Sequence, residues 1–557
     1  MCLLYGLTER NMKIKGVLCI ILIASSFIFL SLHSVLAVHW VISENNDGKF
    51  LFIRNSNGKF WNLTEEAVGN ATICKNVQNA IWDLNSSSGG IVWLPAGTMN
   101  ISNLEICDNV QLQGVGGATI LRRADNTSTN MIHIYKHHDI VISNLHVEGN
   151  NETTWTYYDT SNIRIEGLNP KSYNVTIRDC YFNNSVGSHI MTDHGAYNIL
   201  IENCFFNGRQ HEMYGAAIWF SGSNSIARNN FIKDTYACGI VFEENTYGQA
   251  GGIADGNEIT GETSHGVHCE GTGSANVTII NNHIHDLNSS AYADTALHWS
   301  LGIYLDENCY CANNIIENVD ERGISGTENC TIMYNIVRNV TGECGRNSCG
   351  IIASRSSIII GNYVENIGKD GIQAYSYFDD CHQNIISNNI IKHVGQNKSG
   401  SRGIRLMGNG TISGNYIEDA EIGIYTGINN ANMTVTTIGN RVVNVSNGSY
   451  LYGSNIFKGN YIDNCLFYGI YSQSDNATVS DNIIKNCELH GIHIQNRVNG
   501  IYTGNIIQNC GLDGINENTA SDYNLYMFNN CLYNGGFGID IAGANSNQSC
   551  NLGVIDQ

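Results

Sequence analysis

The stretch Thr411-Ile412-Ser413-Gly414-Asn415-Tyr416-Ile417-Glu418-Asp419-Ala420 contains two short apolar runs that flank a Gly-Asn pair. Apolar and polar residues alternate within each run, which is typical of β-strands. We expect Ile412 and Ile417 to point inward and the polar pair between them to form a corner. Asparagine tolerates the left-handed backbone conformation that a corner needs, and its amide can bond to the same residue above and below in a stack.

This phrase recurs through more than half of the chain, at steps of 20 to 32 residues, and a Gly-Ile or Gly-Val pair follows all but one of the copies. A period in this range is the signature of a solenoid. The asparagines that begin the copies or their close variants are Asn230, Asn257, Asn282, Asn314, Asn335, Asn362, Asn389, Asn415, Asn440, Asn460, Asn482, Asn505 and Asn530. The Gly-Ile or Gly-Val pairs begin at Gly239, Gly266, Gly302, Gly323, Gly350, Gly371, Gly403, Gly423, Gly469, Gly491, Gly514 and Gly538.

The content of the repeat indicates a parallel β-helix. Helical repeats need about ten residues with a 3.6-residue period, whereas these units offer apolar runs of three to five residues broken by Asn, Asp and Gly. Leucine is too scarce for leucine-rich repeats, and two prolines in 557 residues leave the strand ladders intact. A second polar column marks another corner, at Asn318, Asn339, Asn366, Asp419, Asn444, Asn464, Asn486 and Asn509.

Composition limits the partners. Charged residues make up 14% of the chain and the net charge is −21, without a basic patch, so a nucleic-acid partner is not expected. A polyanionic ligand would need a bridging cation. A solenoid grows along one axis, so one elongated domain accommodates the whole repeat region.

The first 37 residues have the features of a signal peptide. Lys13 and Lys15 precede an apolar run over residues 16–38, and Val35-Leu36-Ala37 suits cleavage after Ala37. The run is also long enough to remain as a membrane anchor, which is the alternative. We therefore expect a secreted or cell-surface protein in which sequons such as Asn62 are possible glycosylation acceptors. The expected organisation is 1–37 signal peptide, 38–69 N-terminal segment and 70–557 β-helix domain.

The segment before the repeats resembles the opening of the pectate-lyase-like superfamily of right-handed β-helix proteins. The resemblance is carried by Lys75-Asn76-Val77-Gln78-Asn79-Ala80-Ile81-Trp82, by Gly89-Gly90-Ile91-Val92-Trp93-Leu94-Pro95-Ala96-Gly97 and by Val110-Gln111-Leu112-Gln113-Gly114-Val115-Gly116. It covers about residues 70 to 550. It implies an all-β coil capped by a helix near Asn76–Leu84, and carbohydrate as the usual class of partner. The catalytic signatures of pectate lyases, polygalacturonases and alginate epimerases are missing, so the resemblance implies no specific activity.

The register of the repeat allows a search for candidate site residues. In Gly-Ile-x-x the Ile points inward, so the second and fourth residues after Gly point outward. The fourth position gives carboxylates in four of five consecutive copies, and the second position adds two aromatic residues and a histidine beside them. The carboxylates are Asp193, Glu243, Glu270 and Asp306, and their neighbours are Trp219, His268 and Tyr304.

Stacked carboxylates about 4.8 Å apart repel each other, which raises pKa values or recruits a cation. We expect Glu243, Glu270 and Asp306 to act as acid, base or Ca²⁺ ligands, with His268 assisting proton transfer. Trp219 and Tyr304 offer flat faces for sugar rings, and Asp193 extends the acidic column. Arg322 either binds a substrate carboxylate or pairs with Glu321. A solvated polar face without chemistry is the competing interpretation.

The sequence thus predicts an exported carbohydrate-active β-helix protein that cleaves a polysaccharide, as a lyase or a glycoside hydrolase, with calcium or no cofactor. The alternative is a surface or adhesive protein that binds glycans without catalysis. Among the cysteines, Cys465, Cys487 and Cys510 fill an inward position and are expected to be buried thiols rather than a metal site. Cys344 and Cys349 are predicted to lie in a loop and are the best local disulfide candidates.

Overall fold

The computed structural model describes a nearly continuous coil. The described residues are 38–44, 50–56, 59–63, 70–86, 88–125, 127, 129–149, 160–208, 215–243, 251–271, 276–288, 300–342, 348–375, 382–395, 399–427, 434–543 and 545–553. The proposed signal peptide lies outside them. In the part of the chain that the structure describes, no helix is long and apolar enough to cross a membrane.

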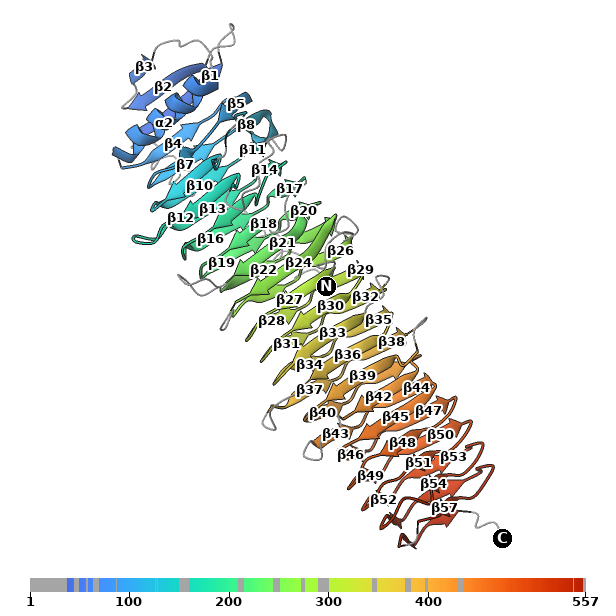
Figure 1. The fold of residues 1–557 in the computed structure, drawn as a ribbon. Helices are drawn as coiled ribbons and strands as arrows, with labels where there is room; N and C mark the ends of the chain where they lie inside the picture. Colours follow the sequence, from blue (N-terminus) through green and yellow to red (C-terminus); the bar gives the residue numbers. More distant parts are fainter. Residues whose placement is uncertain are drawn as a thin grey trace, which may run out of the picture.

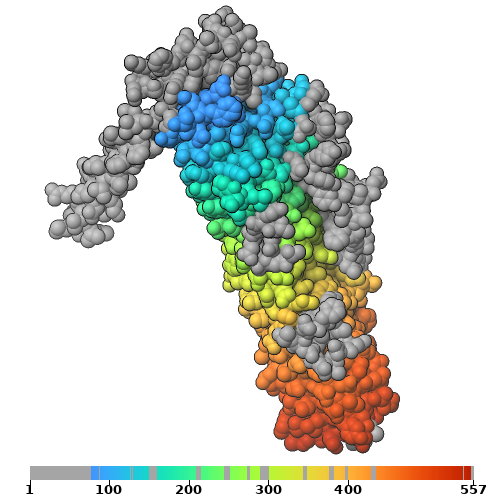
Figure 2. Space-filling model, turned by 60° about the vertical axis from the view of Figure 1, so that its left-hand side comes forward, coloured from blue at the N-terminus to red at the C-terminus, as the bar shows by residue number. Residues whose placement is uncertain are grey.

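Three parallel β-sheets wind around a common axis in a right-handed solenoid of about 16 turns, which confirms the predicted fold class. In Figure 2 the described turns follow one another along a single rod. Within the coil each strand pairs with the third strand after it along the chain. Sheet A runs from β4 (Gly90–Trp93) to β58 (Asn547–Ser549), and sheet B runs from β5 (Gly97–Ile101) to β59 (Leu552–Gly553).

Sheet C carries the candidate site, and its later strands run down the middle of the coil in Figure 1. Its strands are β6 (Leu104–Glu105), β9 (Ile132–Tyr135), β12 (Ile163–Glu166), β15 (Ile190–Thr192), β18 (Ala216–Phe220), β21 (Tyr236–Glu243), β24 (Thr263–Glu270), β27 (Leu301–Leu305), β30 (Arg322–Gly326), β33 (Cys349–Ser354), β36 (Asp370–Tyr375), β39 (Arg402–Met407), β42 (Ile422–Thr426), β45 (Asn447–Tyr452), β48 (Ile470–Gln473), β51 (Ile492–Ile494), β54 (Ile515–Glu517) and β57 (Ile539–Ile541).

A helix covers the N-terminal end of the coil, as expected. Helix α2 (Asn70–Ser86) buries Val77, Ile81 and Leu84 against the first turn and leaves Trp82 exposed. Strand β1 (Val38–Glu44) extends sheet A by pairing in parallel with β4. The antiparallel strands β2 (Phe50–Ser56) and β3 (Lys59–Leu63) continue from β1. A cap of this kind keeps water from the apolar core and protects the first strand edges.

The core is a set of stacked inward side chains. Ile412 and Ile417 are fully buried, as the repeat predicts, and Phe182 stacks on Phe206 with ring centroids 4.8 Å apart. The expected column of buried thiols is confirmed at Cys465, Cys487 and Cys510. The loop placement of Cys349 is wrong, because this residue begins β33 as a buried free thiol whose Sγ lies 3.2 Å from the carbonyl oxygen of Ile351. Its predicted partner, Cys344, lies outside the described residues.

A buried ladder of asparagine amides joins the turns. Asn335 illustrates the pattern: its Nδ2 donates to Asn362 Oδ1 at 3.0 Å and to the carbonyl oxygen of Cys311 at 3.1 Å. Its Oδ1 accepts from the backbone N–H and from Nδ2 of Asn314, at 2.9 and 3.0 Å. Every polar group of the amide is therefore paired in a place without water. The members of the ladder are Asn230, Asn257, Asn282, Asn314, Asn335, Asn362, Asn389, Asn415, Asn440, Asn460, Asn482, Asn505, Asn529 and Asn551.

Two details of the ladder differ from what the sequence predicts. Its late member is Asn529, which accepts from Asn505, and not Asn530, which begins strand β56 (Asn530–Leu532). The left-handed conformation belongs to the residue before each ladder asparagine, such as Asn229 with a φ of 53°. In the second polar column the asparagines themselves are left-handed, as predicted, and Asn366 has a φ of 55°.

The Gly-Ile pairs have a steric cause. A Cβ atom on Gly266 would lie 2.5 Å from the carbonyl oxygen of Gly302 and 2.6 Å from Ile284. The coil bends at this position and successive turns come too close for any side chain. Glycine is therefore required at this position in the strands of sheet C, and the Ile or Val that follows it fills the core.

We expect Asn335→Ala to destabilise the coil by about 3 kcal/mol, because it leaves buried donors and acceptors on Asn314 and Asn362 without partners. Urea unfolding followed by circular dichroism measures the change. Asn366→Gly is the control, since it removes an exposed amide bonded to Asn339 at 3.1 Å while permitting the positive φ. Equal losses for the two variants would contradict a special role for the buried ladder.

Candidate functional site

The outward register predicted for sheet C is confirmed between β18 and β27. Trp219 pairs with Val241, Val241 with His268, and His268 with Tyr304. The carboxylates Glu243 and Glu270 also occupy paired positions, on the neighbouring strands β21 and β24. Residues that are tens of positions apart in sequence thus form one surface near the middle of the coil.

Glu243 is a half-buried acid held by a tryptophan. Its Oε2 accepts a hydrogen bond from the Trp219 indole Nε1 at 2.8 Å. Burial raises the pKa of Glu243, and the negative charges of Glu270 and Asp193 add to this effect. The Trp219 hydrogen bond opposes the shift because it favours the charged carboxylate. The net result is a carboxyl group that keeps its proton to higher pH than an ordinary glutamate.

Glu270 has the opposite environment. Its side chain is 70% exposed, and its Oε2 lies 3.4 Å from His268 Nε2. The hydrogen bond from His268 lowers the pKa of Glu270, despite some burial that acts in the other direction. The carboxyl groups of Glu243 and Glu270 occupy paired positions, yet their pKa values are shifted in opposite directions. A difference of this kind lets one carboxyl group act as an acid and the other as a base.

Aromatic rings continue the surface on the C-terminal side of the two acids. His268 stacks on Tyr304 with centroids 4.9 Å apart and planes at 22°. Burial raises the pKa of Tyr304, with a further contribution from the charge of Asp306. Trp219 on one side and Tyr304 on the other thus flank Glu243 and Glu270.

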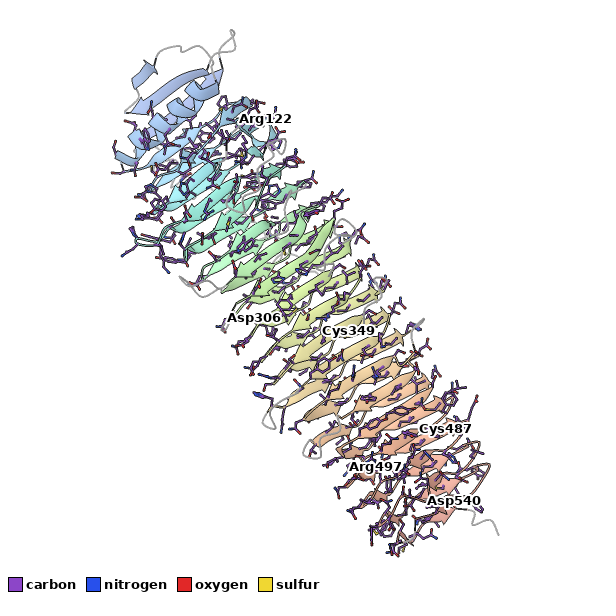
Figure 3. The ribbon with its side chains drawn as sticks, in the orientation of Figure 1. Arg122, Asp306, Cys349, Cys487, Arg497 and Asp540 are labelled. Atoms are coloured by element: carbon purple, nitrogen blue, oxygen red, sulfur yellow. The ribbon has the colours of Figure 1, made fainter. Side chains whose placement is uncertain are left out.

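Two of the expected residues turn to other partners. Asp306, labelled in Figure 3, is 8% exposed, and its Oδ1 accepts from Thr327 Oγ1 at 3.3 Å. Asp306 is therefore buried against Thr327, in contrast to the exposed Glu270. Arg322 lies 3.6 Å from Glu321 and 3.5 Å from the Ser325 hydroxyl. This is the pairing that the sequence left as one of two possibilities.

Asp193 belongs to a separate ionic network on the strands of sheet C that precede β18. Its Oδ2 accepts from Arg164 Nη2 at 2.7 Å, and Arg164 Nε also donates to Glu166 at 2.8 Å. Glu166 accepts in addition from His133 Nε2 at 2.9 Å. This hydrogen bond, assisted by Arg164, lowers the pKa of Glu166 to about 2. The network was missed in the sequence because its partners lie on three different turns.

The described residues place metal-ligand atoms close together in three groups. They are Cys238 with His265 and His268, Glu258 with His283 and His285, and Glu166 with Asp193 and His194. The proposed calcium ligands Glu243, Glu270 and Asp306 do not form such a group, so calcium binding there stays a prediction. Cys238 and His265 were missed, although a signal exists: each immediately precedes the Gly of its copy.

A second aromatic surface lies further along the same face of sheet C. Tyr450 stands over Tyr471 with centroids 4.8 Å apart, and Tyr471 stands over His493 at 5.5 Å. The Arg402 guanidinium lies 4.7 Å above the ring of Tyr425, which precedes Tyr450 in the column. These rings are not among the site residues predicted from the sequence.

The comparisons with known proteins agree with this architecture. Residues 85–284 match the family model described as right handed beta helix region. The chain contains a right-handed β-helix region. No curated protein matches the chain in sequence.

Solved structures with a similar course include the A-module of the Azotobacter vinelandii mannuronan C-5 epimerase AlgE6, at 14% identity, 87% coverage of this chain, 96% of that one and a TM-score of 0.31. A mutant tailspike protein of E. coli bacteriophage HK620 matches at 13% identity, 67% and 71% coverage and a TM-score of 0.40. The Thermotoga maritima exopolygalacturonase matches at 10% identity, 67% and 83% coverage and a TM-score of 0.28. Likenesses this distant do not transfer an activity, so function has to be inferred from the residues of this chain.

The Glu166 network predicts a specific response to acid. Its folded-state pKa of about 2 lies below the ordinary value of 4.5, so the stabilisation is complete above pH 4.5 and is lost as the pH falls toward 2. Glu166→Gln should therefore melt at a lower temperature than the native chain at pH 7. The difference in melting temperature between the two proteins should narrow as the pH falls from 4.5 toward 2. Glu148→Gln serves as the control. In the native chain the Glu148 carboxylate also lies near an arginine, with its Oε2 3.8 Å from Arg122 Nε. If the difference in melting temperature between Glu166→Gln and the native chain stays constant over this pH range, the lowered pKa of Glu166 would be contradicted.

Proposed function

We propose that this chain is an exported protein that binds a polysaccharide along the outer face of sheet C and cleaves it between Glu243 and Glu270. The observation that carries the proposal is the paired placement of these two carboxyl groups between Trp219 and Tyr304. Export is inferred from the sequence of residues 1–37, and it would give the protein access to extracellular glycans.

The geometry suits hydrolysis by two carboxyl groups. Neighbouring strands lie about 4.8 Å apart, close to the roughly 5 Å between the carboxyl groups of retaining glycosidases. Glu243 is the proposed proton donor to the glycosidic oxygen, because burial favours its protonated form. Glu270, exposed and next to His268, is the proposed nucleophile or base. His268 would orient Glu270 and assist proton transfer.

The aromatic residues would hold the sugar chain. The faces of Trp219 and Tyr304 can stack on the apolar faces of sugar rings on either side of the cleaved bond. The rings of Tyr425, Tyr450 and Tyr471 continue the same column toward the C-terminus. A repeating polymer that lies along the coil would meet both surfaces, whereas a small ligand would occupy only one.

Two other functions remain in competition. A lyase would need a cation or Arg322 to neutralise a uronate, and the proposed calcium ligands would have to be drawn together. A non-catalytic glycan-binding protein is favoured by the tyrosine surface, which has no paired carboxylates beside it in the described strands β45 and β48.

A binding screen on a glycan array, run beside assays for new reducing ends and for ultraviolet-absorbing unsaturated products, separates the three functions. New reducing ends without unsaturated products are expected from the proposed hydrolase. Unsaturated products would establish a lyase. Binding of acidic and neutral polysaccharides without any product would leave only the binding function.

We expect Glu243→Gln and Glu270→Gln each to reduce cleavage by about a hundredfold or more while the protein remains folded, since each removes a proton-transferring or nucleophilic group. Glu270→Gln should leave the coil folded, because the side chain is 70% exposed and its contact with His268 contributes little to stability. Glu258→Gln is a matched control: its Oε1 also lies 3.4 Å from a histidine, His285, but on sheet B. Full activity of Glu270→Gln, or an equal loss in Glu258→Gln, would contradict the assignment.

The indole of Trp219 should tune the proton donor. Its hydrogen bond favours the charged form of Glu243, so Trp219→Phe is expected to raise the pKa of this carboxyl group. A general acid works while protonated, so the fall of kcat at high pH should move to higher pH in the variant. The pH profile of kcat at saturating substrate measures this, since a loss of sugar binding alone would change KM. A shift to lower pH would exclude Glu243 as the donor.

A further inference from the structure

Three metal-ligand side chains meet beside the proposed cleavage site, at Cys238, His265 and His268. The Cys238 Sγ lies 3.7 Å from His265 Nδ1, and His265 Nδ1 lies 2.9 Å from His268 Nδ1. All three donor atoms lie within 4.8 Å of one another. Each of the three residues is half-buried, so the point between them is partly screened from water.

The bend at the glycine column creates this meeting point. Cys238 and His265 pair across β21 and β24, each immediately before its glycine, and the next paired residues are Ile240 and Val267. Residues three apart on a flat strand point to opposite faces of the sheet. The rings of His265 and His268 nevertheless stack with centroids 4.8 Å apart, because the alternation of β24 breaks at Gly266 and Val267, which are both buried.

The distances fit a tetrahedral metal ion. A Zn²⁺ ion about 2.3 Å from sulfur and 2.05 Å from nitrogen would hold S and N about 3.5 Å apart and two nitrogens about 3.3 Å apart. The observed separations of 3.7 and 2.9 Å differ from these values by a few tenths of an ångström. Two imidazole nitrogens that face each other can share only one proton, whereas a metal ion accepts both lone pairs.

The surroundings also suit a metal site. The other ring nitrogen of His268, Nε2, lies 3.4 Å from Glu270 Oε2. A carboxylate at this place orients a metal-bound histidine and fixes its tautomer. Sulfur and imidazole ligands select Zn²⁺ over the hard cations Ca²⁺ and Mg²⁺, which prefer oxygen.

The two other groups of candidate ligands are less suitable. In the group of Glu258, His283 and His285, the Nδ1 atom of His285 already lies 2.8 Å from Asp286 Oδ2. In the other, Arg164 donates to both Glu166 and Asp193 and offsets part of their charge. Neither group contains a thiol.

We propose that Cys238, His265 and His268 form a Zn²⁺ site with three protein ligands and a fourth position open to water or to an exogenous ligand. Binding replaces the thiol proton of Cys238, which is released to solvent, and involves no redox change. The site does not depend on the proposed cleavage reaction, and its test needs no activity measurement.

Cobalt(II) titration of the full-length chain, freed of metal by a chelator under reducing conditions, is the direct test. Co²⁺ reports tetrahedral coordination in the visible spectrum and thiolate ligation through a near-ultraviolet charge-transfer band. We expect one equivalent to bind with both signals, and Zn²⁺ but not Ca²⁺ to displace it. Cys238→Ser should remove the charge-transfer band and weaken binding at least about tenfold, and His265→Ala should weaken it similarly.

Cys349→Ser is the matched control, because Cys349, labelled in Figure 3, belongs to the same sheet. Strand pairing places it in the same column of sheet C four strands later, beside Arg322 and Asp370 rather than histidines. Its spectrum should equal that of the native chain. If Cys238→Ser fails to fold, alkylation of the native chain decides: Zn²⁺ should protect Cys238 from modification, as read by peptide mass spectrometry. Weak binding without the charge-transfer band, a band that survives Cys238→Ser in the folded chain, or alkylation of Cys238 unaffected by Zn²⁺ would overturn the proposal.

Discussion

The buried asparagine ladder fixes how each turn of the coil lies on the next. Each amide both donates to and accepts from its neighbours, and the wall of the core offers no water to replace a lost partner. A turn that slipped by one residue would leave several such groups unpaired and would also reverse the faces of its strands. The ladder therefore stabilises one register, and the side chains of the three sheets follow from it.

The candidate site is a consequence of that register. Because turns stack in step, Trp219, Glu243 and Glu270 reach one surface from three successive strands of sheet C. The spacing that pairs carboxyl groups also pairs Cys238 with His265. Acid, base and proposed metal ligands are thus neighbours through the same strand pairing, and the glycine bend decides which of them converge.

Most of the fold could be predicted from the sequence, because a repeat states the same packing rule many times. The inward isoleucines and the thiol column follow directly from residue type and period, whereas the capping helix was implied by the resemblance of the N-terminal segment to β-helix proteins. The exact ladder member near the C-terminus could not be chosen, since Asn529 and Asn530 are adjacent and only strand pairing separates them. The outward face was predicted as a column, yet the partners of its side chains were not: Asp306 turns to Thr327, and Asp193 turns to Arg164. Such choices depend on local bends and hydrogen bonds that a periodic pattern does not encode.

A crystal structure of Glu243→Gln with an oligosaccharide chosen by the glycan screen tests most directly whether sheet C holds a polysaccharide across Glu243 and Glu270. We expect sugar rings on Trp219 and Tyr304, with a glycosidic oxygen within hydrogen-bond reach of residue 243. An oligosaccharide bound only on sheet A or sheet B, or only at Tyr450 and Tyr471, would contradict it.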